Sequence, residues 1–206
     1  YSELGKFDIP QLTLLAQRFS GLSNLDLAKT VTCSQEYGWN QGVWSWEKAF
    51  FNVERKKQNI NVVAIDFGTK QNILRILWSK GCDITIVPAT STFEEIMAHK
   101  PDGIFLSNGP GDPEATAKYT SPVIRDLIFR CELPIFGICL GHQILAIALG
   151  AQTKKMKFGH RGTNHPVKNL KTGKVEITSM NHGFTVNSSF LPESLEETHT
   201  SLFDGS

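Results

Sequence analysis

Residues 134–143 read Pro-Ile-Phe-Gly-Ile-Cys-Leu-Gly-His-Gln, and this stretch indicates the fold. A short apolar run from Pro134 to Gly137 is followed by Cys139 between two glycines, and then by a helical pattern from His142 to Leu149. A buried strand that turns sharply into a helix is typical of α/β sheets. The same turn places a cysteine at a helix N-terminus, so it also indicates a reactive site.

The chain on the amino-terminal side of this turn alternates between two patterns. Apolar runs typical of buried strands alternate with helical patterns over residues 61–65, 71–79, 84–87, 93–99, 103–106 and 122–130. Such alternation predicts an α/β fold with an open, mostly parallel sheet and helices on both faces, of the flavodoxin-like kind. Beyond Gly150 the alternation ends, and residues 164–184 are predicted to form turns and antiparallel strands.

Residues 1–58 do not show this alternation of strand and helix patterns. Apolar residues recur at helical spacing from Ile9 to Phe19, with Asp8 placed to cap the helix, and a second short helix is predicted near residues 25–29. The polar run 54–59 is a predicted linker. We therefore expect 1–58 to be the end of a smaller amino-terminal domain plus linker, and 59–206 to be the α/β domain. Because the chain starts without Met and stops after a turn-like sequence, we expect a fragment of a longer polypeptide.

Composition excludes several classes of function. Of the 206 residues, 40% are hydrophobic and 20% are charged, and the net charge is +1, which is typical of a globular protein without an electrostatic footprint for nucleic acid or anionic membrane. No apolar run has the length of a membrane span, and no signal peptide opens the chain. The four cysteines form no Cys-x-x-Cys pair. We expect a cytoplasmic protein with no metal site and no nucleic-acid or membrane partner.

Cys139 is the strongest candidate for chemistry. In the Gly-x-Cys-x-Gly turn, flanking glycines relieve crowding around a strained nucleophile, and free N–H groups at the helix start favour a thiolate. The N–H of Leu140 could also receive an oxyanion. The competing interpretation is a small buried side chain, as we expect for Cys33, Cys82 and Cys131.

Two further motifs follow predicted strands. Gly109-Pro110-Gly111-Asp112-Pro113 is a tight connection, and it matches no phosphate-binding pattern. Asp66-Phe67-Gly68 imitates the magnesium motif of protein kinases, but the other kinase motifs are missing. The sequence therefore predicts no cofactor in this chain.

Several motifs together resemble the class I glutamine amidotransferases, and within them the small, glutamine-hydrolysing chains of carbamoyl-phosphate synthetase. They are the turn at 137–143, Ser-Asn-Gly-Pro-Gly-Asp-Pro at 107–113, Lys-Phe-Gly-His-Arg-Gly-Thr-Asn-His-Pro at 157–166, Met-Asn-His-Gly-Phe at 180–184 and Gly-Leu-Ser-Asn-Leu-Asp-Leu-Ala-Lys at 21–29. The resemblance covers essentially the whole chain.

The resemblance implies a role for each matched residue. Cys139 would be the nucleophile, and backbone at Gly111 and Leu140 would hold the oxyanion. The glutamine would be positioned by Gly109, Gly111, Leu140, Gln143, Asn181, Gly183 and Phe184. The ammonia would pass to a large partner chain that uses ATP and Mg²⁺ to make carbamoyl phosphate from bicarbonate, for arginine and pyrimidine biosynthesis.

The chain departs from this family in one respect. The family's catalytic His is followed by Pro-Glu, and none of the histidines after the turn has that context; His165 comes nearest but is followed by Pro166 and Val167. The triad His and Glu are therefore absent from this chain, and we expect the 206 residues alone to be inactive or very weak. Three alternatives stay open: a glutaminase of another class I amidotransferase, a hydrolase of the same fold, and a catalytically silent partner.

Overall fold

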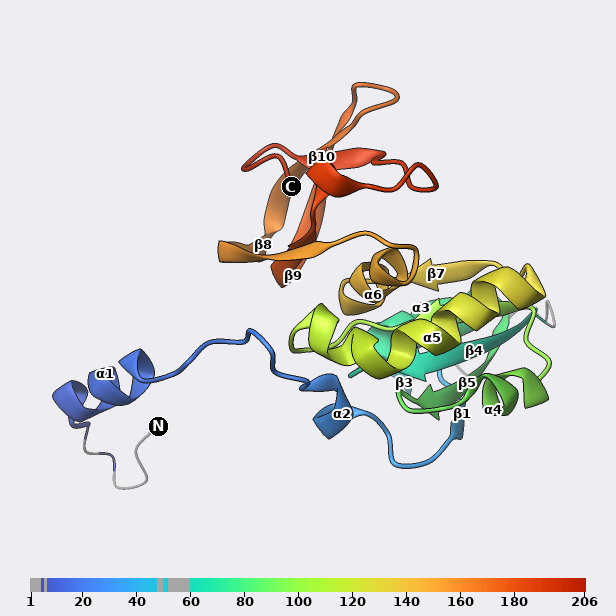
Figure 1. Cartoon of the computed structure of the whole chain (residues 1–206). Helices are drawn as coiled ribbons and strands as arrows, with labels where there is room; N and C mark the ends of the chain where they lie inside the picture. The colour runs from blue at the N-terminus through green and yellow to red at the C-terminus, as the bar shows by residue number, and fades with distance from the viewer. Residues whose placement is uncertain (1–4, 6, 48–49, 52–59) are drawn as a thin grey trace.

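A five-stranded sheet forms the centre of the molecule (Figure 1). The structure is a computed structural model that describes residues 5, 7–47, 50–51 and 60–206. The strand order is β1-β5-β4-β6-β7, with β4 to β7 parallel and β1 antiparallel at one edge. The strands are β1 (Tyr37–Trp39), β4 (Ile60–Asp66), β5 (Cys82–Pro88), β6 (Gly103–Leu106) and β7 (Ile135–Gly137).

Helices cover both faces of this sheet, as the alternating patterns predict. Strand β4 shows the principle, because Val63 and Ile65 lie in one buried cluster and Ala64 lies in the other. The first cluster includes residues of α4 (Phe93–Ala98), α5 (Pro113–Cys131) and α6 (Leu140–Ala148). The second includes Leu74 and Trp78 of α3 (Gln71–Ser79). The open, mostly parallel α/β fold is confirmed.

A second sheet follows α6 and is antiparallel, again as predicted. It has the order β10-β8-β9, with β8 (Thr153–Asn169) and β9 (Val175–Val186) forming a long hairpin and β10 (His199–Ser201) on its outer side. A 3₁₀ turn, η1 (Ser188–Phe190), connects β9 toward β10. The sheet lies on the α6 side of the molecule (Figure 1), and the buried Gln143 of α6 donates from Nε2 to the carbonyl of Phe184 at 2.7 Å. This bond ties α6 to the second sheet, close to Cys139.

The amino-terminal part is joined to the central sheet. Helix α1 (Ile9–Gln17) forms as predicted, with the Asp8 carboxylate accepting from the N–H of Gln11 at 3.0 Å. The second helix, α2 (Ala28–Val31), lies three residues later than predicted. A small pair, β2 (Trp44–Ser45) and β3 (Phe50–Phe51), follows β1. The predicted linker at 54–59 lies outside the described residues, so the domain boundary remains a prediction.

Two helices begin earlier than their sequence patterns suggest. Helix α5 starts at Pro113 and not near residue 122, because Asp112 caps it by accepting from the N–H of Glu114 at 2.9 Å. A proline at the first helical position loses no hydrogen bond, so Asp-Pro is a start signal. Pro122 then lies inside the helix. Helix α6 starts at Leu140, directly after Cys139.

The turn between β7 and α6 is possible only with glycines. A Cβ on Gly141 would lie 2.2 Å from the carbonyl oxygen of Leu106, and one on Gly137 would lie 2.6 Å from the backbone nitrogen of His142. The N–H of Gly141 donates to the carbonyl of Ser107 at 3.0 Å. The helix start is thus pressed against the end of β6, with backbone touching backbone.

We predict that Gly141→Ala lowers the free energy of unfolding by about 2 kcal/mol or more, because the methyl group forces α6 away from β6. The matched control is Gly38→Ala, where an added Cβ meets nothing within 4 Å. That change should stay within about 0.5 kcal/mol of the parent protein. Urea unfolding measures both, and equal midpoints for the two variants would contradict the packing described here.

Candidate active site

Cys139 stands in the strained conformation that the sequence pattern predicts. Its backbone angles are φ 52° and ψ −108°, and it is the residue that immediately precedes α6. A positive φ is uncommon for a residue other than glycine and costs about 1–3 kcal/mol, so it persists only where surrounding contacts enforce it. The glycine contacts on both sides supply that enforcement.

Burial and the polar groups around the sulfur shift the pKa of Cys139 in opposite directions. The N–H of Leu140 donates to the Cys139 sulfur, and Sγ lies 3.9 Å from the carbonyl oxygen of Asn181. Burial raises the pKa of the Cys139 thiol, and it outweighs the lowering by the Leu140 N–H and by the positive charge of Lys70. The expectation that the surroundings favour a thiolate is therefore wrong for this structure. The helix start does lower the pKa, but desolvation is the larger effect.

A cavity of about 730 Å³ opens beside the sulfur. Its size is ordinary for a small-molecule site. Six of the seven residues expected to position glutamine line it together with Cys139, namely Gly109, Gly111, Gln143, Asn181, Gly183 and Phe184. The seventh, Leu140, has a buried side chain behind the wall, and only its N–H reaches the sulfur. Connections at the carboxyl edge of the central sheet, helix α6 and strand β9 of the second sheet thus all contribute to one pocket.

The glycines of the 109–113 connection are required by packing. A Cβ on Gly109 would lie 2.1 Å from the carbonyl oxygen of Phe67. Gly111 has φ +101°, and a Cβ there would lie 2.6 Å from the carbonyl oxygen of Leu25. Next to it, the Asp112 carboxylate accepts from the N–H of Asn24 at 2.7 Å. The segment around Asn24 and Leu25 therefore packs against this connection at the edge of the pocket. Leu22 of the same segment lines the pocket itself.

Asp66, which imitates a kinase motif, is an anchor for the loop after β4. Its carboxylate accepts from the N–H groups of Cys33 at 2.8 Å, Gly68 at 3.0 Å and Thr69 at 2.8 Å. Burial raises the pKa of Asp66, but these bonds and that of the Thr69 hydroxyl hold it below its ordinary value. The side chain is therefore a carboxylate, and it holds the loop after β4 in place.

Lys70 and Arg161 are charged residues that line this pocket and that sequence reasoning missed. The loop is held from a second side by Asn108, whose amide donates to the carbonyl of Gly68 and accepts from the N–H of Lys70, both at 3.0 Å. Lys70 then lines the pocket and lowers the pKa of Cys139. Its position at the carboxyl end of the first parallel strand was a usable signal, because ligands bind at that edge of such sheets.

The histidines near the site do not form a metal centre. Among the residues that the structure describes, no three His, Cys, Asp or Glu side chains are arranged to hold a metal ion. His142 and His182 line a second cavity of about 430 Å³ that also reaches Cys139. His182 donates from Nδ1 to the carbonyl of Phe184 at 2.8 Å, since a carbonyl can only accept.

We predict that Lys70→Met slows alkylation of Cys139 by iodoacetamide roughly two- to fivefold near neutral pH, from one lost charge contact. Removing the positive charge raises the thiol pKa further, so the midpoint of the pH–rate profile moves to higher pH. The matched control is Lys80→Met at the opposite end of α3, about 15 Å away along the helix axis. Mass spectrometry of the labelled peptides reports the rate for each cysteine. A midpoint that stays in place in Lys70→Met would contradict the assigned contact.

Comparison with known proteins agrees with the geometry. The family described as "Glutamine amidotransferase class-I" matches residues 63–206. The chain is 58% identical over 202 residues to the carbamoyl phosphate synthase small chain of Ruegeria pomeroyi, covering 98% of this chain and 52% of that protein. It is 59% identical over 200 residues to the small chain of Bartonella bacilliformis, covering 97% and 49%. The chain thus spans about half the length of the curated relatives it matches.

Solved structures agree on the fold. A glutamine amidotransferase from Thermotoga maritima superimposes with a TM-score of 0.55 at 21% identity, over 70% of this chain and 68% of that one. Along the described part of the chain, every helix is too short or too polar to span a bilayer. The family match covers most of the chain, and the strained Cys139 and the pocket beside it lie within the matched residues. This chain therefore belongs to the class I glutamine amidotransferase family.

Proposed function

We propose that this chain is the glutamine-hydrolysing part of a carbamoyl-phosphate synthetase small chain. The observation that carries the proposal is the pocket at Cys139, where a nucleophile on a strained turn faces residues of a second sheet. The similarity to small chains over 98% of the sequence selects this member among the amidotransferases. We place the enzyme in the cytoplasm.

The reaction would proceed through a thioester. The Cys139 thiolate attacks the side-chain amide carbon of L-glutamine, and the carbonyl oxygen becomes an oxyanion within reach of the N–H groups of Leu140 and Gly111. The carbon–nitrogen bond then breaks, and the nitrogen takes a proton and leaves as ammonia. Water attacks the thioester, which releases glutamate and restores the thiol. Glutamine and water become glutamate and ammonia.

The raised pKa of Cys139 sets a requirement for this mechanism. Burial keeps the sulfur protonated at neutral pH, so attack needs a base that accepts the thiol proton. Within the described residues, the hydrogen-bond acceptor at the sulfur is the Asn181 carbonyl, which cannot take up a proton. We propose that the base is the histidine of the family's His-Pro-Glu motif, in a part of the whole protein outside these 206 residues.

The partner follows from the product. Ammonia would be delivered to a large synthetase chain, which activates bicarbonate with ATP and Mg²⁺ and forms carbamoyl phosphate. The small and large chains would form a heterodimer or a larger assembly. Residues of this chain would serve glutamine binding and hydrolysis, and the phosphate chemistry would belong to the large chain.

We predict that Cys139→Ser in the whole small chain, assayed with its large chain, lowers glutamate release from glutamine at least about 10³-fold, because the nucleophile is lost. Carbamoyl phosphate formation from ammonia supplied directly should stay unchanged, since it bypasses the glutamine site. The control is Cys131→Ser, whose sulfur lies against Met97 Sδ at 3.8 Å, away from the pocket. Retained glutaminase activity in Cys139→Ser would refute the proposed function.

A second prediction concerns the base. The 206 residues alone should release glutamate from glutamine at least about 10²-fold more slowly than the whole small chain, the usual contribution of a general base. A diazoketone analogue of glutamine should label Cys139 ahead of Cys33, Cys82 and Cys131, because Cys139 lines the pocket proposed to bind glutamine and the other three do not. Near-normal turnover by the 206 residues would show instead that one of their own histidines, such as His142 or His182, is the base.

A further inference from the structure

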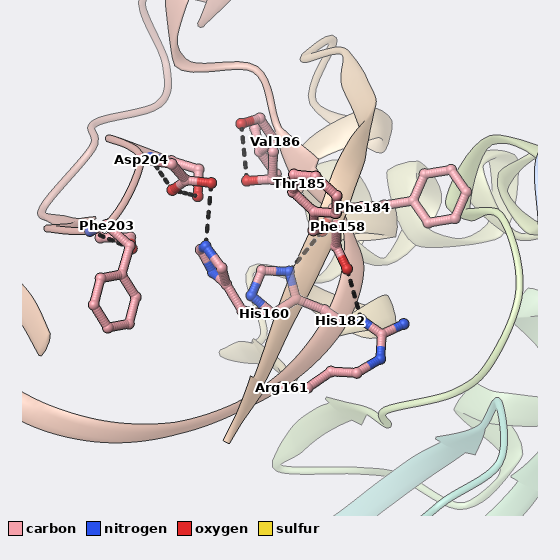
Figure 2. A network of polar contacts seen from close by, with 11 residues as sticks. Phe158, His160, Arg161, His182, Phe184, Thr185, Val186, Phe203 and Asp204 are labelled. Carbon is pink, nitrogen blue, oxygen red and sulfur yellow. Dashed lines mark hydrogen bonds and ion pairs between the residues drawn. The ribbon is translucent and has the colours of Figure 1, made fainter. Parts of the chain in front are cut away.

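A cluster of three histidines, His160, His165 and His182, and one aspartate, Asp204, lies beside the pocket. Figure 2 shows His160, His182 and Asp204. His160 is at its centre. Its ring lies 5.0 Å from the ring of His182 at 86° and 5.1 Å from the ring of His165, measured between centroids. Its Nε2 lies 3.1 Å from Oδ2 of Asp204. The cluster thus joins β8, β9 and the turn that follows β10.

Stability alone does not explain these buried rings. His160 is 6% exposed and His165 is 7% exposed, and the Nδ1 atom of each has no hydrogen-bond partner among the described residues. A buried polar atom without a partner destabilises a folded protein, and apolar side chains of similar size would avoid that loss. We therefore look for a role of these buried polar rings other than packing.

Asp204 is fixed so that one oxygen faces His160. Its Oδ1 accepts from the N–H and the hydroxyl of Ser206 at 3.1 and 2.7 Å, which leaves Oδ2 for His160. Burial raises the pKa of Asp204, but the bonds from Ser206 and the contact with His160 hold it below its ordinary value. The carboxylate therefore accepts, and His160 Nε2 is the donor.

His160 in turn contacts β9, the strand that carries three of the residues expected to bind the substrate glutamine. It is paired with His182 across the β8–β9 ladder, and Arg161 is paired with Asn181. His182 donates to the Phe184 carbonyl at 2.8 Å, the same oxygen that receives Gln143 Nε2 at 2.7 Å. Figure 2 shows this succession from Asp204 through His160 to His182 and Phe184.

We propose that His160 and Asp204 are positioning residues for the glutamine pocket. The Asp204 carboxylate orients the His160 ring, and the ring holds His182 against the Phe184 carbonyl. The segment Asn181–Phe184 is thereby kept at the distance from Cys139 that glutamine needs. This inference rests on the proposed function, because it deepens the substrate side of the same pocket.

The test uses the whole small chain assembled with its large chain. His160→Ala should raise the KM for glutamine about tenfold or more with kcat changed less than about twofold, because ground-state positioning is lost and the nucleophile is kept. His160→Gln should recover most of the loss, since its side-chain amide can donate to Asp204 in place of Nε2. Asp204→Ala should act in the same direction, and its side chain is 43% exposed, so the change leaves no buried cavity.

The matched control is Glu36→Gln, which alters a second histidine–carboxylate pair, His99 Nε2 with Glu36 Oε2 at 3.0 Å, remote from the pocket. It should leave the KM for glutamine unchanged. The KM for ammonia supplied directly should be unchanged in every variant.

Three results would overturn the positioning role alone: an unchanged KM for glutamine in Asp204→Ala, equal effects of His160→Gln and His160→Ala, or a parallel loss of ammonia-dependent activity. Failure of the proposed function looks different, because the parent protein itself would then release no glutamate.

Discussion

The contact of α6 with the end of β6 is the constraint on which the rest of the structure depends. Gly141 approaches so closely that no side chain fits, and its N–H bonds to the Ser107 carbonyl at 3.0 Å. Because the helix must begin at that point, the chain has only two residues, Ile138 and Cys139, in which to turn, and Cys139 takes a positive φ of 52°. Packing between a helix and a strand thus determines where the sulfur stands.

The same packing explains why position and ionisation are separate properties of this cysteine. The close approach that fixes the sulfur also removes it from water, and burial raises the pKa of its thiol. One N–H from Leu140 and the charge of Lys70 oppose this effect without overcoming it. The turn therefore presents a thiol that must lose its proton to a general base before it can attack, as is usual for cysteine nucleophiles paired with a base.

The pocket depends equally on the antiparallel sheet that follows. Gln143 on α6 reaches across to the Phe184 carbonyl on β9, and the Asn181 carbonyl lies over the sulfur at 3.9 Å. The site thus has one wall formed by α6 and the turn before it, and the other formed by β9. The wall on β9 belongs to a long hairpin, and the cluster around His160 joins that hairpin to the turn after β10.

Local sequence was sufficient for the elements whose signals lie within a few residues. The strand-to-helix turn, the α3 helix, the Asp8 cap and the apolar run of β4 are all readable from the local sequence, because periodicity and capping act over one or two turns of chain. The residues around Cys139 were recognisable for the same reason, since their motifs are contiguous. Their gathering into one cavity could be expected only from the family resemblance.

Tertiary structure decided what depends on contacts between distant segments. The antiparallel pairing of β1 with β5, the use of Asp66 as a loop anchor and the approach of His160 to Asp204 join residues that no local pattern connects. The sign of the pKa shift at Cys139 belongs to the same group. Desolvation is the sum of all atoms packed around a group, and a sequence reveals that sum only after the chain has folded.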